Sequence, residues 1–192
     1  ARSRAAQPPG AATVALGLHV AHQVRIELLR ARRQGGNRVR QDLQGRLIQR
    51  IEHLPIAPED ADKGFSYEIF NQFAPGSGSD PGRQPIARIL AFRGTDLTGL
   101  SDIFYGTLRS DQIELALRYF AAERARLGTD VPWIVSGHSL GGALATEVSQ
   151  AHPEVRAYMF NTSPFYRNEV RENALRRTVF NERGEFLRRF AR

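Results

Sequence analysis

The chain has 192 residues, enough for one domain with a sizeable apolar core, and its 41% hydrophobic content is ordinary for a globular protein. It contains no cysteine, which excludes a disulfide framework and a cysteine-based metal site. The net charge is +7, and the basic residues are spread evenly without interleaved aromatics, so we expect attraction to anionic lipid surfaces rather than nucleic-acid binding.

Targeting signals are weak in this sequence. No apolar run approaches the ~20 residues that a membrane-spanning helix needs. The segment from Ala11 to Ala21 is mildly apolar but contains His19, which makes it a poor signal peptide. Because the numbering begins without methionine, secretion or export stays open and the localisation is not assigned.

The N-terminal third predicts helices. Residues 1–12 have the composition of a disordered arm. A helix is expected from Thr13 to about Arg33, and a second from Val39 to Leu54, where apolar residues recur three or four positions apart. We therefore assign residues 1–63 to an arm and a helical pair packed on the core, followed by a polar loop from Pro55, and residues 64–192 to the core itself.

The core begins with a predicted β-hairpin. Gly64 to Phe73 and Gln84 to Phe92 read as strands, and the turn-rich stretch from Ala74 to Arg83 lies between them. Ser110 can cap a helix to Leu127, and Gly128 is its stop signal.

The second half of the chain predicts parallel strands. A strand over Val131 to Ser136, a helix from Leu140 and a strand over Val155 to Thr162 form a right-handed crossover. Arg177 to Asn181 reads as one more strand. This pattern indicates the α/β fold class within a single domain.

Gly137, Ser139 and Gly141 form the G-x-S-x-G pattern of a nucleophile elbow. A sharp strand-to-helix turn presents the serine hydroxyl at the edge of a sheet, and the flanking positions must be nearly free of side chains. The turn also aims the N–H of Leu140 at the place where an oxyanion would form. The alternative is an ordinary turn, but the apolar strand before the motif and the helix after it favour the elbow.

Three segments together resemble the class 3 lipases: AFRGTD (91–96), SGHSLGGALA (136–145) and MFNTSPF (159–165). The resemblance covers about residues 64–190, and its first two motifs are the specific ones. It implies an α/β-hydrolase-like, mostly parallel sheet flanked by helices, with the N-terminal helical pair outside the match and the C-terminal part of the fold missing from this chain.

The resemblance also implies site residues. Ser139 matches the nucleophile, and the N–H groups of Thr95 and Leu140 match the oxyanion hole. Glu185 best matches the triad acid, with Glu182 as the runner-up and a surface carboxylate as the alternative. Residues 97–105 match the lid of the family, although a plain packed loop fits equally well. No metal or cofactor is implied.

The catalytic histidine has no match. His152 lies about 20 Å along the elbow helix from its start, too far to reach Ser139, and the family treats the position of His138 as variable. We expect the base on a C-terminal segment beyond Arg192. A second chain that supplies it, or a relative that has lost it, are the alternatives.

These patterns predict a lipase or phospholipase A type of serine hydrolase that acts on lipid esters at a membrane or micelle surface. One alternative is an esterase of soluble short-chain esters. The other is an inactive hydrolase-like domain that binds lipid or protein. A protein partner or inhibitor is conceivable for an exported protein, but no residue pattern identifies one.

Overall fold

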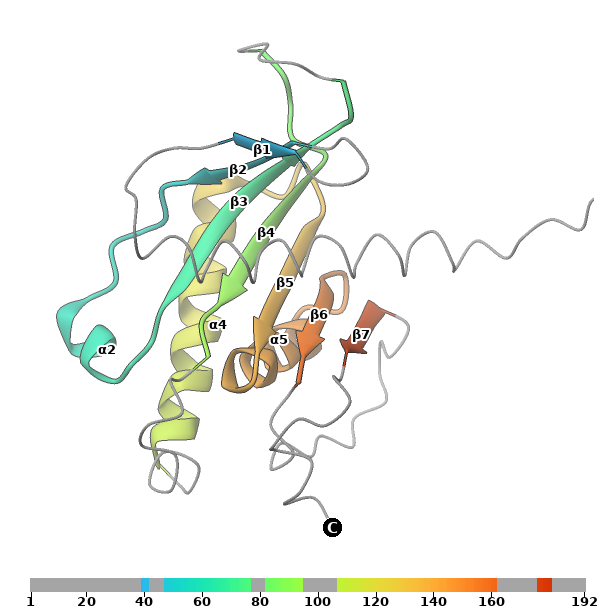
Figure 1. The fold of residues 1–192 in the computed structure, drawn as a ribbon. Coiled ribbons are helices and arrows are strands. Elements are labelled where there is room, and N and C mark those ends of the chain that lie inside the picture. The colour runs from blue at the N-terminus through green and yellow to red at the C-terminus, as the bar shows by residue number, and fades with distance from the viewer. Residues whose placement is uncertain (1–38, 42–46, 77–81, 95–106, 162–175, 181–192) are drawn as a thin grey trace, which may run out of the picture.

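A seven-stranded mixed β-sheet forms the centre of the computed structural model, which describes residues 39–41, 47–76, 82–94, 107–161 and 176–180 (Figure 1). The strands are β1 (Val39–Gln41), β2 (Leu47–Ile51), β3 (Tyr67–Phe73), β4 (Ala87–Phe92), β5 (Trp133–His138), β6 (Arg156–Phe160) and β7 (Arg177–Phe180). Their order across the sheet is their order in the chain. The arm and the helix predicted from Thr13 lie outside the described residues.

The sheet changes direction at β4. Strands β1 to β4 pair antiparallel, whereas β4 to β7 pair parallel. The predicted hairpin of β3 and β4 and the predicted parallel crossover from β5 to β6 are both confirmed. The expectation of a mostly parallel sheet is wrong for the first half, where each strand up to β4 runs back along its predecessor and the antiparallel ladders follow.

The second predicted N-terminal helix is also wrong. The stretch from Val39 to Leu54 contains β1 and β2, which pair with each other, and β2 continues into the sheet through β3. The apolar spacing of four positions that suggested a helix is also a multiple of two. It therefore places residues such as Leu47 and Ile51 on the same face of a strand.

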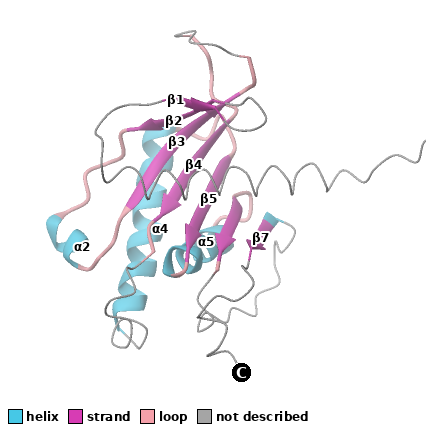
Figure 2. Cartoon of the chain, in the orientation of Figure 1, coloured by secondary structure: helices cyan, strands magenta, loops and turns pink. Residues whose placement is uncertain are grey.

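Three described helices accompany the sheet: α2 (Pro58–Asp62), α4 (Thr107–Leu127) and α5 (Leu140–Ala151). The predicted helix beginning at Leu140 and the predicted helix end at Leu127 are confirmed. The predicted cap at Ser110 is wrong, because α4 already begins at Thr107, and α2 falls in a stretch that was expected to be a loop. Both long helices lie behind the sheet in the view of Figure 2. They share this face because the two successive crossovers step in the same direction with the same hand.

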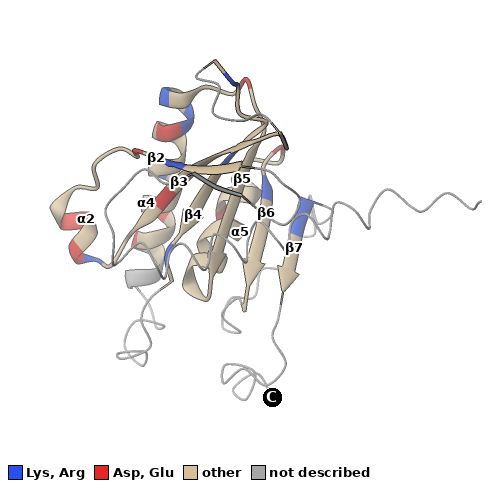
Figure 3. Ribbon diagram, turned by 45° about the horizontal axis from the view of Figure 1, so that its top comes forward, with Lys and Arg blue, Asp and Glu red and all other residues tan. Residues whose placement is uncertain are grey.

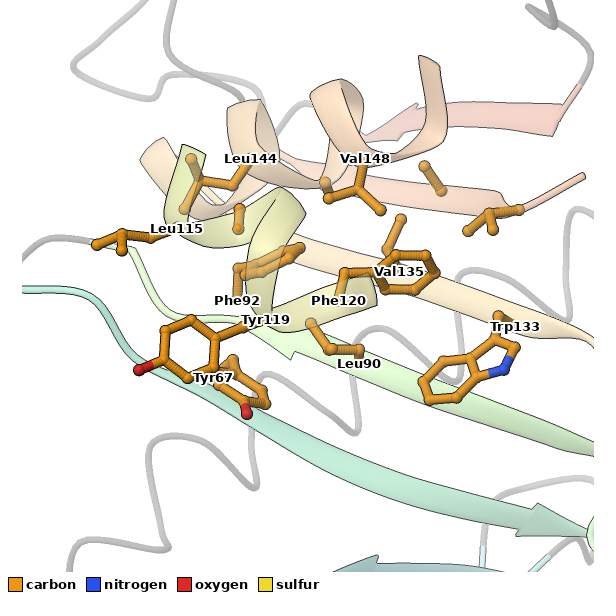
Figure 4. Packing of buried hydrophobic residues seen from close by; sticks show 14 of the residues in the cluster. Tyr67, Leu90, Phe92, Leu115, Tyr119, Phe120, Trp133, Val135, Leu144 and Val148 are labelled. Carbon is orange, nitrogen blue, oxygen red and sulfur yellow. The ribbon is translucent and has the colours of Figure 1, made fainter. Parts of the chain in front are cut away.

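The main apolar core lies between this face and the two long helices (Figure 4). Phe120 of α4 meets the indole of Trp133 edge-on, and Leu144 and Val148 of α5 pack in the same cluster. Leu90 is fully buried beneath them. Packing of this kind fixes how α5 sits on the sheet, and hence where its N-terminus points.

Buried acids tie the segment between β2 and β3 to α4. Glu123 is fully buried and accepts hydrogen bonds from the Leu54 N–H, the Tyr67 hydroxyl and the Arg126 guanidinium. Asp60, on helix α2, whose acidic positions are red in Figure 3, accepts from Tyr119 and Arg118. Burial, followed by the neighbouring Glu123 carboxylate, raises the pKa of Tyr67 well above its usual range, so this hydroxyl remains a donor.

Candidate active site

Ser139 forms the turn between β5 and α5. Its backbone angles are φ 55° and ψ −119°, a positive φ that side-chain-bearing residues rarely adopt. Such a conformation costs about 1–3 kcal/mol and persists only when its surroundings enforce it. The predicted sharp turn is therefore present, and it is strained at the serine itself.

Two glycines enforce the turn by close backbone contact. A Cβ placed on Gly137 would lie 2.1 Å from the carbonyl carbon and oxygen of Gly141. A Cβ on Gly141 would lie 2.5 Å from the Phe92 carbonyl oxygen, at the end of β4. Both separations are shorter than any side chain tolerates, so α5 approaches β5 as closely as the sequence pattern predicted, and it also approaches the end of β4.

The end of β4 adjoins the same turn. A Cβ on Gly94 would lie 2.5 Å from the His138 carbonyl oxygen and 3.6 Å from the Ser139 Cβ. Thr95 itself lies outside the described residues, so its part in an oxyanion hole stays a prediction. Gly94, which sequence reasoning did not single out, is the described residue that brings this segment beside the serine.

Backbone hydrogen bonds hold Ser139 on both sides. Its N–H donates to the Phe160 carbonyl at 3.0 Å, and its carbonyl accepts from Gly142 and Ala143 at 3.0 and 3.3 Å. Leu140 is the first residue of α5, so its N–H has no acceptor within the helix. That N–H and the helix N-terminus are suited to stabilise a negative charge above the turn.

The serine is enclosed. Ser139 is 5% exposed and Leu140 is 8% exposed. Hydrogen bonds to a charge that develops at such an enclosed position are stronger than in water.

Two of the three described histidines contact groups away from the turn at Ser139. His152 ends α5, contacts Arg124 at 3.2 Å and packs on the ring of Phe120. His53 contacts the Leu54 carbonyl through Nδ1 and the ring of Tyr67. These contacts of His53 and His152 lead to groups other than the Ser139 hydroxyl, so the catalytic base is not assigned.

Several predicted site residues fall outside the described part of the chain. These are the acid candidates Glu185 and Glu182, and the lid candidate at residues 97–105. The described residues contain no group of three or more metal-ligating side chains. None of the helices that they form is long and apolar enough to cross a membrane.

Comparison of the chain with protein-family models, with curated proteins and with solved structures finds no match. The resemblance to class 3 lipases therefore stays a prediction. The sequence motifs and the geometry around Ser139 are what bear on function.

The sequence analysis did not single out one residue beside the turn at Ser139. Asn161, directly after β6, is the only described non-glycine residue besides Ser139 with a positive φ, here 44°. Asparagine is one of the few residue types that tolerate this conformation. An asparagine directly after a predicted strand is therefore a sequence feature that can indicate a positive φ.

Proposed function

We propose that the protein is a serine hydrolase of the α/β-hydrolase type that cleaves carboxylic esters of lipids, with Ser139 as the nucleophile. The observation that carries this proposal is the strained serine at a glycine-flanked strand-to-helix turn. If the turn had no function, glycine or asparagine at this position would adopt the positive φ with less strain than serine. A nucleophile, in contrast, requires the serine hydroxyl there.

The chemistry is acyl transfer. The Ser139 oxygen attacks the ester carbonyl while a general base accepts its proton. The Leu140 N–H, together with that of Thr95, stabilises the resulting oxyanion. The alcohol then leaves with a proton from the base, and water hydrolyses the acyl-enzyme to regenerate the serine. The base and the acid that orients it belong to chain outside the described residues or to a partner.

Lipid esters are the favoured substrates for two reasons. The motifs resemble those of class 3 lipases, and the net charge of +7 would draw the protein to anionic lipid surfaces. A soluble short-chain ester is the competing substrate, and an inactive binding domain is the competing function.

Labelling with a fluorophosphonate probe tests the nucleophile. The chain, Ser139→Ala and Ser149→Ala would be treated in parallel, and the adduct mapped by mass spectrometry. Ser149 is an apt control because it is a buried serine on the same helix whose hydroxyl bonds to the Thr146 carbonyl. We expect the adduct on Ser139 in the parent and in Ser149→Ala, and no adduct in Ser139→Ala.

A folded parent chain that takes up no label, and still takes up none when extended beyond Arg192, would contradict the proposed activity and favour the binding domain. If Ser139 is labelled, a series of esters with lengthening acyl chains separates the two substrate classes. Hydrolysis that rises once the ester forms micelles indicates a lipase, whereas a preference for short soluble esters indicates an esterase.

A further inference from the structure

We infer that Asn161 is a positioning residue for the Ser139 nucleophile, acting through the peptide group between Phe160 and Asn161. This inference rests on the proposed function, because positioning of a nucleophile matters only if Ser139 reacts. The same contacts also predict a backbone effect that can be measured without any reaction.

Ser139 and Asn161 occupy equivalent places on neighbouring parallel strands. His138, the last residue of β5, is paired with Phe160, the last residue of β6, and Phe160 is paired with Phe180 of β7. Ser139 and Asn161 follow directly, and both have positive φ. The chain thus turns in the same unusual way at the ends of two adjacent strands.

One peptide group joins the two turns. The Phe160 carbonyl accepts the Ser139 N–H at 3.0 Å, and the N–H on the other side of the same peptide, that of Asn161, donates to the Phe180 carbonyl at 2.8 Å. Because a peptide group is planar, it can keep both bonds only in one orientation. β7 is therefore connected to the nucleophile through a single rigid unit.

The φ angle of Asn161 is the rotation next to this unit. At 44° it lets the chain leave β6 while the peptide keeps its two hydrogen bonds. The residue is 3% exposed, so its surroundings hold it in place. A residue that disfavours positive φ would rotate the peptide toward a relaxed angle, weaken its bond to the Ser139 N–H and loosen the strained turn.

The test compares Asn161→Ala with Asn161→Gly. Alanine strains the positive φ, whereas glycine adopts it freely. Gly128→Ala is the matched control, since it places alanine at φ +83° in the segment before β5. Ser139 follows the opposite end of that strand. Three quantities would be measured in each variant: the rate constant of fluorophosphonate labelling, the thermal unfolding temperature, and the hydrogen exchange of the Ser139 amide.

We expect Asn161→Ala to label about tenfold more slowly and to exchange the Ser139 amide faster. In Asn161→Gly, the labelling rate and the exchange rate of the Ser139 amide should both be close to those of the parent chain. Gly128→Ala should lower the unfolding temperature to a similar extent but leave the labelling rate unchanged. Equal labelling in Asn161→Ala and the parent, or equal slowing in Gly128→Ala, would overturn the inference.

The failure of the proposed function has a different signature. If the parent chain takes up no label, Ser139 is not an activated nucleophile. Hydrogen exchange of the Ser139 amide alone then decides whether Asn161 holds the turn. Faster exchange in Asn161→Ala but not in Gly128→Ala would still show that Asn161 holds the turn. Unchanged exchange of the Ser139 amide in Asn161→Ala would show that Asn161 does not hold the turn.

Discussion

At the scale of the residue, the turn at Ser139 depends on what its neighbours lack. The carbonyl group of Gly141 occupies the space in which a Gly137 side chain would begin, and Gly141 in turn lies against the backbone of β4. Three segments thus meet backbone to backbone. A methyl group at either glycine would push α5 away from the sheet and open the strained angle of the serine.

We predict that Gly137→Ala destabilises the fold by roughly 3 kcal/mol or more, because overpacking of rigid backbone cannot be relieved by side-chain movement. Gly76→Ala is the control, since a Cβ there meets nothing within 4 Å. Its only destabilising effect is the strain of alanine at a φ of +72°. Urea unfolding of the two variants measures the difference. Equal losses would show that the contact at Gly137 is unimportant.

The sequence could predict this turn because its requirements are local. The glycines, the serine and the flanking apolar strand and helix all lie within about twenty residues, and each has a backbone reason to be there. The positive φ of Asn161 was not predicted. An asparagine after a strand permits that angle but does not require it, and the hydrogen bond from its N–H to the Phe180 carbonyl depends on the pairing of β6 with β7.

At the scale of the element, the same limit explains the misassigned helix over 39–54. Apolar residues four positions apart satisfy a helix and a strand alike, and only the antiparallel pairing of β2 with β3 decides between them. The short helix α2 was missed because it has few residues and its Asp60 is stabilised by Tyr119 and Arg118 of α4 rather than by local capping.

The attachment of this region to α4 should depend on Glu123. Its carboxylate serves three donors from three segments while fully buried. We predict that Glu123→Leu destabilises the fold by about 3 kcal/mol, since it removes the acceptor shared by the Leu54 N–H and the Tyr67 hydroxyl, whereas the part-exposed Arg126 keeps its bond to the Glu52 carbonyl. Glu123→Gln keeps an acceptor oxygen and should cost about half as much.

Chemical denaturation measures both losses, and hydrogen exchange at Leu54 locates them. The Leu54 amide should exchange faster in Glu123→Leu, while amides in β5 keep their relative protection. A variant that loses stability uniformly, without a larger effect at Leu54, would show that Glu123 is not the anchor of this segment.

At the scale of the whole molecule, stability should vary with pH through His152. Burial, and then the positive charge of Arg124, lower the pKa of His152 below its ordinary value of 6.5. The unfolded chain therefore binds this proton more readily than the folded one. The free energy of unfolding should fall as pH drops below about 6.5, until the folded pKa is passed.

Replacement of His152 by glutamine removes the titration at this position. We expect the difference in free energy of unfolding between parent and His152→Gln to change between pH 7.5 and pH 5, with the parent losing more in acid. Urea unfolding at closely spaced pH values measures it. Parallel curves for the two proteins would contradict the assignment.

The order of the strands has a consequence for how the protein forms. Every described strand pairs with the strand that precedes it in the chain, and the sheet grows from β1 to β7 without a later strand inserting between earlier ones. A chain emerging from the ribosome can therefore add each strand to an edge that already exists. The turn at Ser139 acquires its last support, the Phe160–Asn161 peptide held by β7, only when the final described strand has been synthesised, so the serine becomes fully ordered late in biosynthesis.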